Sequence, residues 1–203
     1  MTSPFGRNET NLEVNNHESW QLGALASQGI YIGNLTLTSW AVERARLTVI
    51  GQQIATNGSL PKELARTRSA FYTTFALDAM FNLARYSRIA GAVPDLWTFV
   101  DTNGTTLHNA LDFLVPYAVD GDPWPFPQVT ERCVTCPILL LRRVSIMLLT
   151  CASFQVTDWS WGNTFSTFLR GGSAWGKRYE TWAQLTPGNH SADPAQLLWP
   201  VVE

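Results

Sequence analysis

The sequence contains little charge of either sign. Its 203 residues include 14 Lys and Arg and 16 Asp and Glu, which gives a net charge of −2 and a charged fraction of 15%. A nucleic-acid partner normally requires a basic surface, so this balance argues against one. Hydrophobic residues make up 45% of the chain, which is typical of a globular protein. The length suits one domain with a sizeable core.

Cysteine is also scarce. Cys133 and Cys136 have the spacing of a redox motif or half a zinc site, and Cys151 leaves an odd cysteine over. No second pair exists and no His follows at zinc-finger spacing. The sequence therefore predicts free or locally paired cysteines and no metal site.

Long apolar runs are missing too. The most apolar stretch, Ile138 to Phe154, is interrupted by Arg142 and Arg143. It is too short and too charged to span a bilayer, so we predict a buried helix there and no membrane association. The first residues of the chain lack the apolar core of a signal peptide.

Glycosylation sequons, in contrast, are frequent. The Asn-x-Ser/Thr pattern occurs at Asn8, Asn34, Asn57, Asn103 and Asn189. Several of these sites fall in predicted turns, where a glycan is tolerated. They favour a secreted, extracellular glycoprotein whose signal peptide is not part of the given chain.

No segment shows the alternation of a strand, whereas helical periodicity recurs. Helices are predicted from near Glu18 to Ile32, Leu37 to Thr56, Lys62 or Arg66 to Ala90, Thr105 or Thr106 to Val115, and Ile138 to Phe154. Three prolines exclude a helix interior from Asp120 to Gln128. The fold class is therefore all-α, built of antiparallel helical hairpins.

Two polar segments stand out against this scaffold. One is Asn15-Asn16-His17 with Trp20, and the other contains Arg66, Arg68 and Tyr72. Together they offer an amide, an imidazole, a guanidinium and a phenol.

Such a set suits cleavage of a polyuronate by β-elimination. The C5 hydrogen of a uronate leaves only when the C6 carboxylate is neutralised, and Asn16, His17 and Arg66 could supply the donors. Tyr72 could act as base, as acid, or as both. A phenol becomes a base where cations stabilise its phenolate form, which Arg66 or Arg68 could do.

Each residue also has a purely structural interpretation. Asn15 and Asn16 could cap the following helix, and His17 could be a hydrogen-bonded structural residue. The two arginines could pair with Glu63 on a solvated face, and Tyr72 could belong to the core.

Helix geometry constrains the functional interpretation. Arg66 and Tyr72 are six residues apart and would not share a helix face, whereas Arg68 and Tyr72 would. Arg66 reaches Tyr72 only if it precedes the regular helix, which the Leu60-Pro61 entry allows.

The combined motif resembles the alginate lyase domain. It consists of Asn-Asn-His followed by Trp, then Leu-Pro-x-Glu-Leu-x-Arg-Thr-Arg-Ser with Tyr shortly after. The segments Gly104 to Leu114 and Pro123 to Gln128 are similar to it as well. The resemblance covers about residues 11–128 and becomes faint after Cys133.

The resemblance implies an (α/α) toroid around a groove and β-elimination of alginate or glucuronan without a metal or other cofactor. Asn16 and His17 would then contact the C6 carboxylate, with His17 a second candidate base. Arg66 would orient and activate Tyr72, which would transfer the proton. Asn15, Trp20 and Arg68 would bind substrate. The spacing of six from Arg66 to Tyr72 resembles the glucuronan/alginate branch more than the bacterial mannuronate lyases, so the uronate stays open.

The family carries a large helical region before Asn-Asn-His, whereas 14 residues precede Asn15 here. We therefore expect residues 1–203 to form a single, incomplete domain, part of a toroid, in which residues 133–203 are unassigned. Exposed helix faces would favour self-association.

Two other functions are consistent with the sequence. One is a helical carbohydrate-binding or interaction module that has lost turnover. The other is an inverting glycoside hydrolase, which needs two opposed carboxylates. Asp78, Asp95, Asp112 and Glu63 are available for this role, but none lies in a matching motif.

Overall fold

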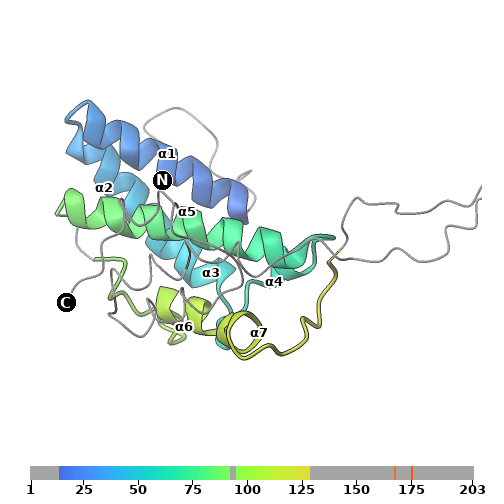
Figure 1. Cartoon of the computed structure of the whole chain (residues 1–203). Helices are drawn as coiled ribbons and strands as arrows, with labels where there is room; N and C mark the ends of the chain where they lie inside the picture. Colours follow the sequence, from blue (N-terminus) through green and yellow to red (C-terminus); the bar gives the residue numbers. More distant parts are fainter. Residues whose placement is uncertain (1–13, 92–94, 129–166, 168–174, 176–203) are drawn as a thin grey trace, which may run out of the picture.

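The computed structural model describes residues 14–91 and 95–128 together with Thr167 and Trp175 (Figure 1). Its elements are α1 (Asn16–Tyr31), α2 (Leu35–Arg44), the π-helix η2 (Ala45–Ile50), α3 (Gly51–Gln53), α4 (Pro61–Leu64), α5 (Ser69–Ile89), α6 (Leu107–Asp112) and α7 (Val115–Ala118). Within these residues every regular element is helical, which confirms the all-α prediction. A single antiparallel bridge, Arg68 to Gln128, pairs two extended residues there.

The helices α1 and α5 lie side by side and run in the same direction, and α2 returns along α1 (Figure 1). The N-terminal turns of α1 and α5 therefore lie at the same end of the molecule. This arrangement brings Asn16 and Tyr72 to one end, although 56 positions separate them in the sequence.

The core lies between these helices. Leu22 and Ala26 of α1 are buried together with Leu77 and Phe81 of α5. Phe81 stacks on Trp97, with ring centroids 5.3 Å apart. Burial of each such side chain contributes roughly 1.5–3 kcal/mol, so α1 and α5 hold each other in place.

A glycine allows α1 and α2 to cross closely. A Cβ atom at Gly29 would lie 2.4 Å from Oγ1 of Thr38 and 2.9 Å from its backbone nitrogen. Thr38 in turn donates a hydrogen bond to the carbonyl of Ala26, at 3.2 Å. Any side chain at position 29 would force the hairpin apart.

The prediction of one continuous helix from Leu37 to Thr56 was wrong in detail. The segment begins at Leu35, widens into the π-helix η2 and ends at Gln53. The wide turn coincides with a buried carboxylate on α1. Glu18 accepts hydrogen bonds from Nε of Arg44 at 3.1 Å and from Oγ1 of Thr48 at 2.9 Å. Short π-helical turns inside α-helices occur frequently near functional sites.

The predicted third helix is also divided. The short helix α4 ends at Leu64 and α5 begins at Ser69, so Arg66 lies in the break. The proline-rich loop closes the start of α5, because Ser69 N donates to the Pro127 carbonyl at 3.0 Å and Ala70 N donates to Oε1 of Gln128 at 2.9 Å. These contacts cap two of the N–H groups that a helix start leaves without partners.

The same loop holds Ser69 through its side chain. The Ser69 hydroxyl donates to the Pro127 carbonyl and accepts from Nε1 of Trp124, at 2.7 Å. Trp124 packs in turn against Tyr117 and Phe126. The prediction that this loop is not helical is confirmed.

The fourth helix was predicted too long. It ends at Asp112, and α7 begins at Val115 with Pro116 in its first turn. A proline is favourable there because the first-turn N–H groups have no partner within the helix. Thr106 caps α6, as one of the two threonines was expected to do.

Several predictions fall outside the described residues: the three cysteines, the helix from Ile138 to Phe154, and the sequons at Asn8 and Asn189. The sequon asparagines Asn34, Asn57 and Asn103 are all exposed. Among the helices described, none combines the length and apolar character needed to cross a bilayer.

We expect the Gln128→Ala substitution to destabilise the protein by about 1 kcal/mol, because it removes a cap from α5. Urea unfolding followed by circular dichroism measures the change. Gln21→Ala, an exposed glutamine of α1, serves as the control and should alter stability by less than about 0.5 kcal/mol. Equal effects of the two substitutions would contradict the capping role.

We also expect self-association. Tyr31, Ile32 and Leu35 are 91%, 64% and 54% exposed around the turn between α1 and α2. Contiguous exposed apolar groups favour association. Light scattering should show a mass above that of one chain, reduced in the double variant Ile32→Ser, Leu35→Gln. A monodisperse monomer at all concentrations would count against this expectation.

Candidate functional site

The first turn of α1 carries the Asn-Asn-His motif. Asn15 is the N-cap, and its side-chain oxygen accepts a hydrogen bond from His17 N at 2.9 Å. Its carbonyl accepts from the backbone N–H groups of Glu18 and Ser19. The predicted capping role of this pair is therefore present at Asn15, whose side-chain oxygen already has a protein partner.

Asn16 is held by a buried carboxylate. Its backbone N–H donates to Oε1 of Glu63 at 2.8 Å, and its Nδ2 donates to Oε2 at 2.7 Å. Both residues are 2% exposed. A carboxylate at a helix N-terminus also interacts favourably with the helix dipole. The structural interpretation of Glu63 as a surface partner of Arg66 and Arg68 is therefore wrong.

Behind this turn, further polar contacts fix α1 to its neighbours. Ser19 donates to Oε1 of Gln53 at 3.0 Å, and Glu18 binds Arg44 and Thr48. Within the described residues, Oε2 of Glu18 and Nε2 of Gln53 have no hydrogen-bond partner. Hydrogen bonds from the first turn of α1 therefore reach Glu63 of α4 as well as residues of α2, η2 and α3.

Arg66 lies over the ring of Tyr72. Its guanidinium carbon is 4.0 Å from the ring centroid, which is a cation–π contact. The contact forms because Arg66 precedes the regular helix α5. This position of Arg66 was predicted from the sequence as the requirement for the contact. The structure therefore brings these two predicted site residues together.

The spacing of Arg68 and Tyr72 had predicted a shared helix face, and this prediction was wrong. Arg68 is the N-cap of α5, so its side chain departs from the helix start. Its guanidinium carbon lies 4.8 Å from the ring centroid of Phe71 instead. Within the described part of the chain, neither Arg66 nor Arg68 pairs with a carboxylate. Two positive charges therefore remain at this end of α5.

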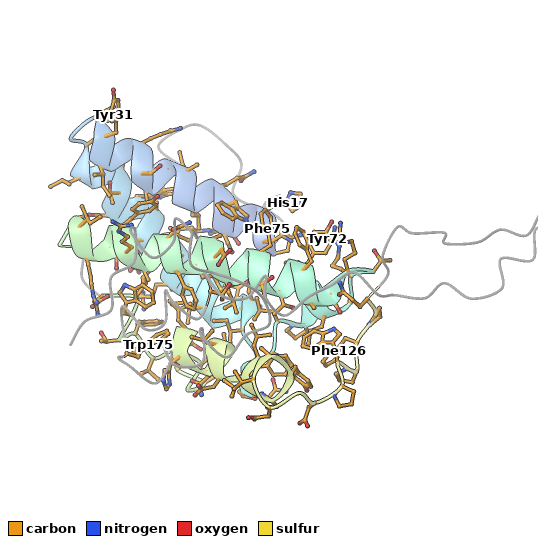
Figure 2. The ribbon with its side chains drawn as sticks, in the orientation of Figure 1. His17, Tyr31, Tyr72, Phe75, Phe126 and Trp175 are labelled. Carbon is orange, nitrogen blue, oxygen red and sulfur yellow. The ribbon has the colours of Figure 1, made fainter. Side chains whose placement is uncertain are left out.

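Trp20 joins the two segments. Its ring centroid lies 4.8 Å from that of Phe75, one turn beyond Tyr72. Figure 2 shows His17, Tyr72 and Phe75 at the same end of the α1–α5 pair. Phe75 was not among the predicted site residues, because a phenylalanine on a helical stripe indicates core packing.

Three polar groups at this end make no hydrogen bond or ion pair with the described residues: the exposed imidazole of His17, the hydroxyl of Tyr72 and the guanidinium of Arg66. By contrast, the backbone donors in the first turn of α1 are all occupied. A ligand at this end must therefore be recognised by side chains. The set can donate to an anion and exchange a proton beside it.

The carboxylates considered for a hydrolase have other contacts. Glu63 binds Asn16, Asp95 binds Nε of Arg88 at 2.8 Å, and Asp78 accepts from Thr167 at 3.0 Å. Asp112 lies 3.6 Å from Nδ1 of His108. The structure offers no specific support for an opposed catalytic pair among them.

Comparison with known proteins identifies the family. The family model described as alginate lyase matches residues 1–124. The chain belongs to the alginate lyase family. The match covers most of the region that carries the motif, so the recognition made from the sequence is confirmed.

A solved structure shows the fold. The crystal structure of an alginate lyase from Bacteroides ovatus matches 93% of this chain with a TM-score of 0.68 and 24% sequence identity. The prediction of a partial (α/α) toroid is thereby confirmed. This alginate lyase family chain covers 43% of the length of that structure. The comparison of this chain with curated proteins found no match.

The Glu63 contact predicts a large effect on stability. We expect Glu63→Ala to destabilise the protein by about 3 kcal/mol, because it removes both acceptors from buried donors. Glu63→Gln keeps one acceptor and should cost roughly half as much. Chemical unfolding of both variants measures the difference.

The matched control is Glu43→Gln. Glu43 pairs with Arg46 at the surface, where its side chain is 45% exposed. Breaking such a pair costs about 0–1 kcal/mol. A Glu63→Ala variant as stable as this control would show that the buried contact does not hold α1.

Proposed function

We propose that the chain is a polysaccharide lyase that cleaves a uronate polymer of the alginate or glucuronan type by β-elimination. The observation that carries the proposal is the contact of Arg66 with Tyr72, at the same end of the α1–α5 pair as His17, in the region that matches the family. The polar groups of these side chains make no hydrogen bond or ion pair with other described residues, and they match the chemistry that the reaction requires.

The sugar carboxylate needs neutralisation before the C5 hydrogen becomes acidic. We assign this task to His17 and to the amide hydrogen of Asn16 that Glu63 leaves unused. Asn16 is only 2% exposed, so its free amide hydrogen can reach the sugar carboxylate only if the carboxylate lies against the first turn of α1. Arg68 and Trp20 extend the contact with the polymer, whereas Asn15 supports it through its cap.

The proton steps belong to Tyr72, with His17 a second candidate base. The deprotonated oxygen of Tyr72, whose ring contacts the guanidinium of Arg66, accepts the C5 proton. The electron pair of the broken C–H bond forms the C4–C5 double bond, and the C4–O4 bond breaks. The new phenol returns its proton to O4, so the enzyme ends in its starting state. These steps use no metal ion.

Replacement of Tyr72 by Phe tests this proposal. We expect the Tyr72→Phe variant to lose cleavage at least about a hundredfold, because the proton carrier is removed. Product accumulation is followed by ultraviolet absorbance of the new double bond, on polymannuronate, polyguluronate and glucuronan separately. Tyr31→Phe, which alters a 91% exposed tyrosine, is the control and should retain activity.

The result of this assay separates the candidates. Cleavage that survives Tyr72→Phe would exclude the assigned role, and products without a double bond would indicate a hydrolase. A second candidate is a helical carbohydrate-binding module without turnover. It predicts polysaccharide binding without any rise in absorbance. In either case the partner is an acidic polysaccharide, encountered outside the cell if the sequons are used.

A further inference from the structure

A groove of about 200 Å³ follows the α1–α5 pair beyond the candidate site. Trp20, Ala24 and Ser27 line it from α1, and Ala79, Asn82 and Tyr86 line it from α5. The small side chains of Ala24 and Ala79 leave the space open. The aromatic rings of Trp20 and Tyr86 contribute its largest apolar surfaces.

The groove also presents polar groups that have no partner. The side-chain amide of Asn82 and the hydroxyl of Tyr86 make no hydrogen bond within the described residues. The Ser27 hydroxyl donates to the Ala24 carbonyl at 2.9 Å, which leaves its lone pairs able to accept. Aromatic surface with a few convergent donors and acceptors is the usual composition of a small-ligand site.

No Lys, Arg, Asp or Glu is among the residues that line the groove. The groove therefore differs from the end of α5, where Arg66 and Arg68 carry charge. A sugar unit would be held here by its ring face and hydroxyl groups. Its carboxylate would meet no positively charged side chain among the lining residues.

The position of the groove connects it with the candidate active site. Trp20 contacts Phe75, which lies one turn beyond Tyr72. Because α1 and α5 run in the same direction, the lining residues from Trp20 to Ser27 and from Ala79 to Tyr86 lead away from that contact along both helices. Asn82 is ten residues beyond Tyr72, or about 15 Å along the helix. A polymer bound at Tyr72 therefore reaches Asn82 only through several of its units.

We propose that this groove is a charge-independent sugar subsite, in which Asn82, Tyr86 and Trp20 bind a unit of the polymer remote from the cleaved bond. The subsite rests on the proposed lyase function. It would give the protein a preference for longer chains. Because no ionic contact is involved, its contribution would persist at high salt, whereas binding by Arg66 and Arg68 would weaken.

The test compares Asn82→Leu with Gln28→Leu, an exposed amide on α1 outside the groove. We expect Asn82→Leu to raise KM for mannuronate, guluronate or glucuronate hexamers about fivefold, the loss of one hydrogen bond, without changing KM for trimers. The factor should be the same at low and high salt. Ala24→Met, at an exposed helical position, narrows the groove from outside and should act like Asn82→Leu.

Binding of the same oligomers to the Tyr72→Phe chain, followed by calorimetry, provides a readout without turnover. Hexamer binding that weakens with Asn82→Leu supports the subsite even if the wild type cleaves nothing, in which case the lyase function alone fails. Cleavage with no effect of Asn82→Leu or Ala24→Met on chain-length dependence overturns the subsite and leaves the lyase function intact. Absence of both cleavage and binding overturns both.

Discussion

The buried contact between Glu63 and Asn16 is the interaction on which the candidate site depends. One carboxylate accepts the backbone and side-chain N–H groups of Asn16, and so joins α4 to the start of α1. Burying a carboxylate is costly unless hydrogen bonds compensate for the lost water, and both oxygens of Glu63 accept from Asn16, so the position of α4 relative to α1 is narrowly determined. His17 follows Asn16 directly, so the same contact determines where the imidazole lies.

The break between α4 and α5 is the second constraint. A continuous helix would direct Arg66 and Tyr72 to different faces, whereas the break places the guanidinium on the phenol ring. The break requires α5 to begin at Ser69, and the proline-rich loop supplies acceptors for its first two N–H groups. Pro127 and Gln128 therefore help to position Tyr72 by holding the start of α5, although they are more than 50 residues away from it in the sequence.

The parallel course of α1 and α5 links the candidate active site to the groove. Both helix starts lie at one end, where the macrodipoles favour an anion, although protein acceptors already occupy the first N–H groups. Charged and polar side chains gather at that end, and an uncharged groove extends from it. This division suits a polymer whose reacting unit needs its charge neutralised and whose distant units need only to be held.

The sequence by itself determined the all-α class, the family, which segments up to residue 115 contain helix, and the pairing of Arg66 with Tyr72 on condition of a helix break. These follow from local periodicity, caps and a specific motif. Only the tertiary structure decided that Glu63 is buried against Asn16, that Arg68 faces Phe71, and that the second helix contains a π turn. The physical reason is that a buried polar group depends on partners from distant segments, which local sequence patterns do not specify.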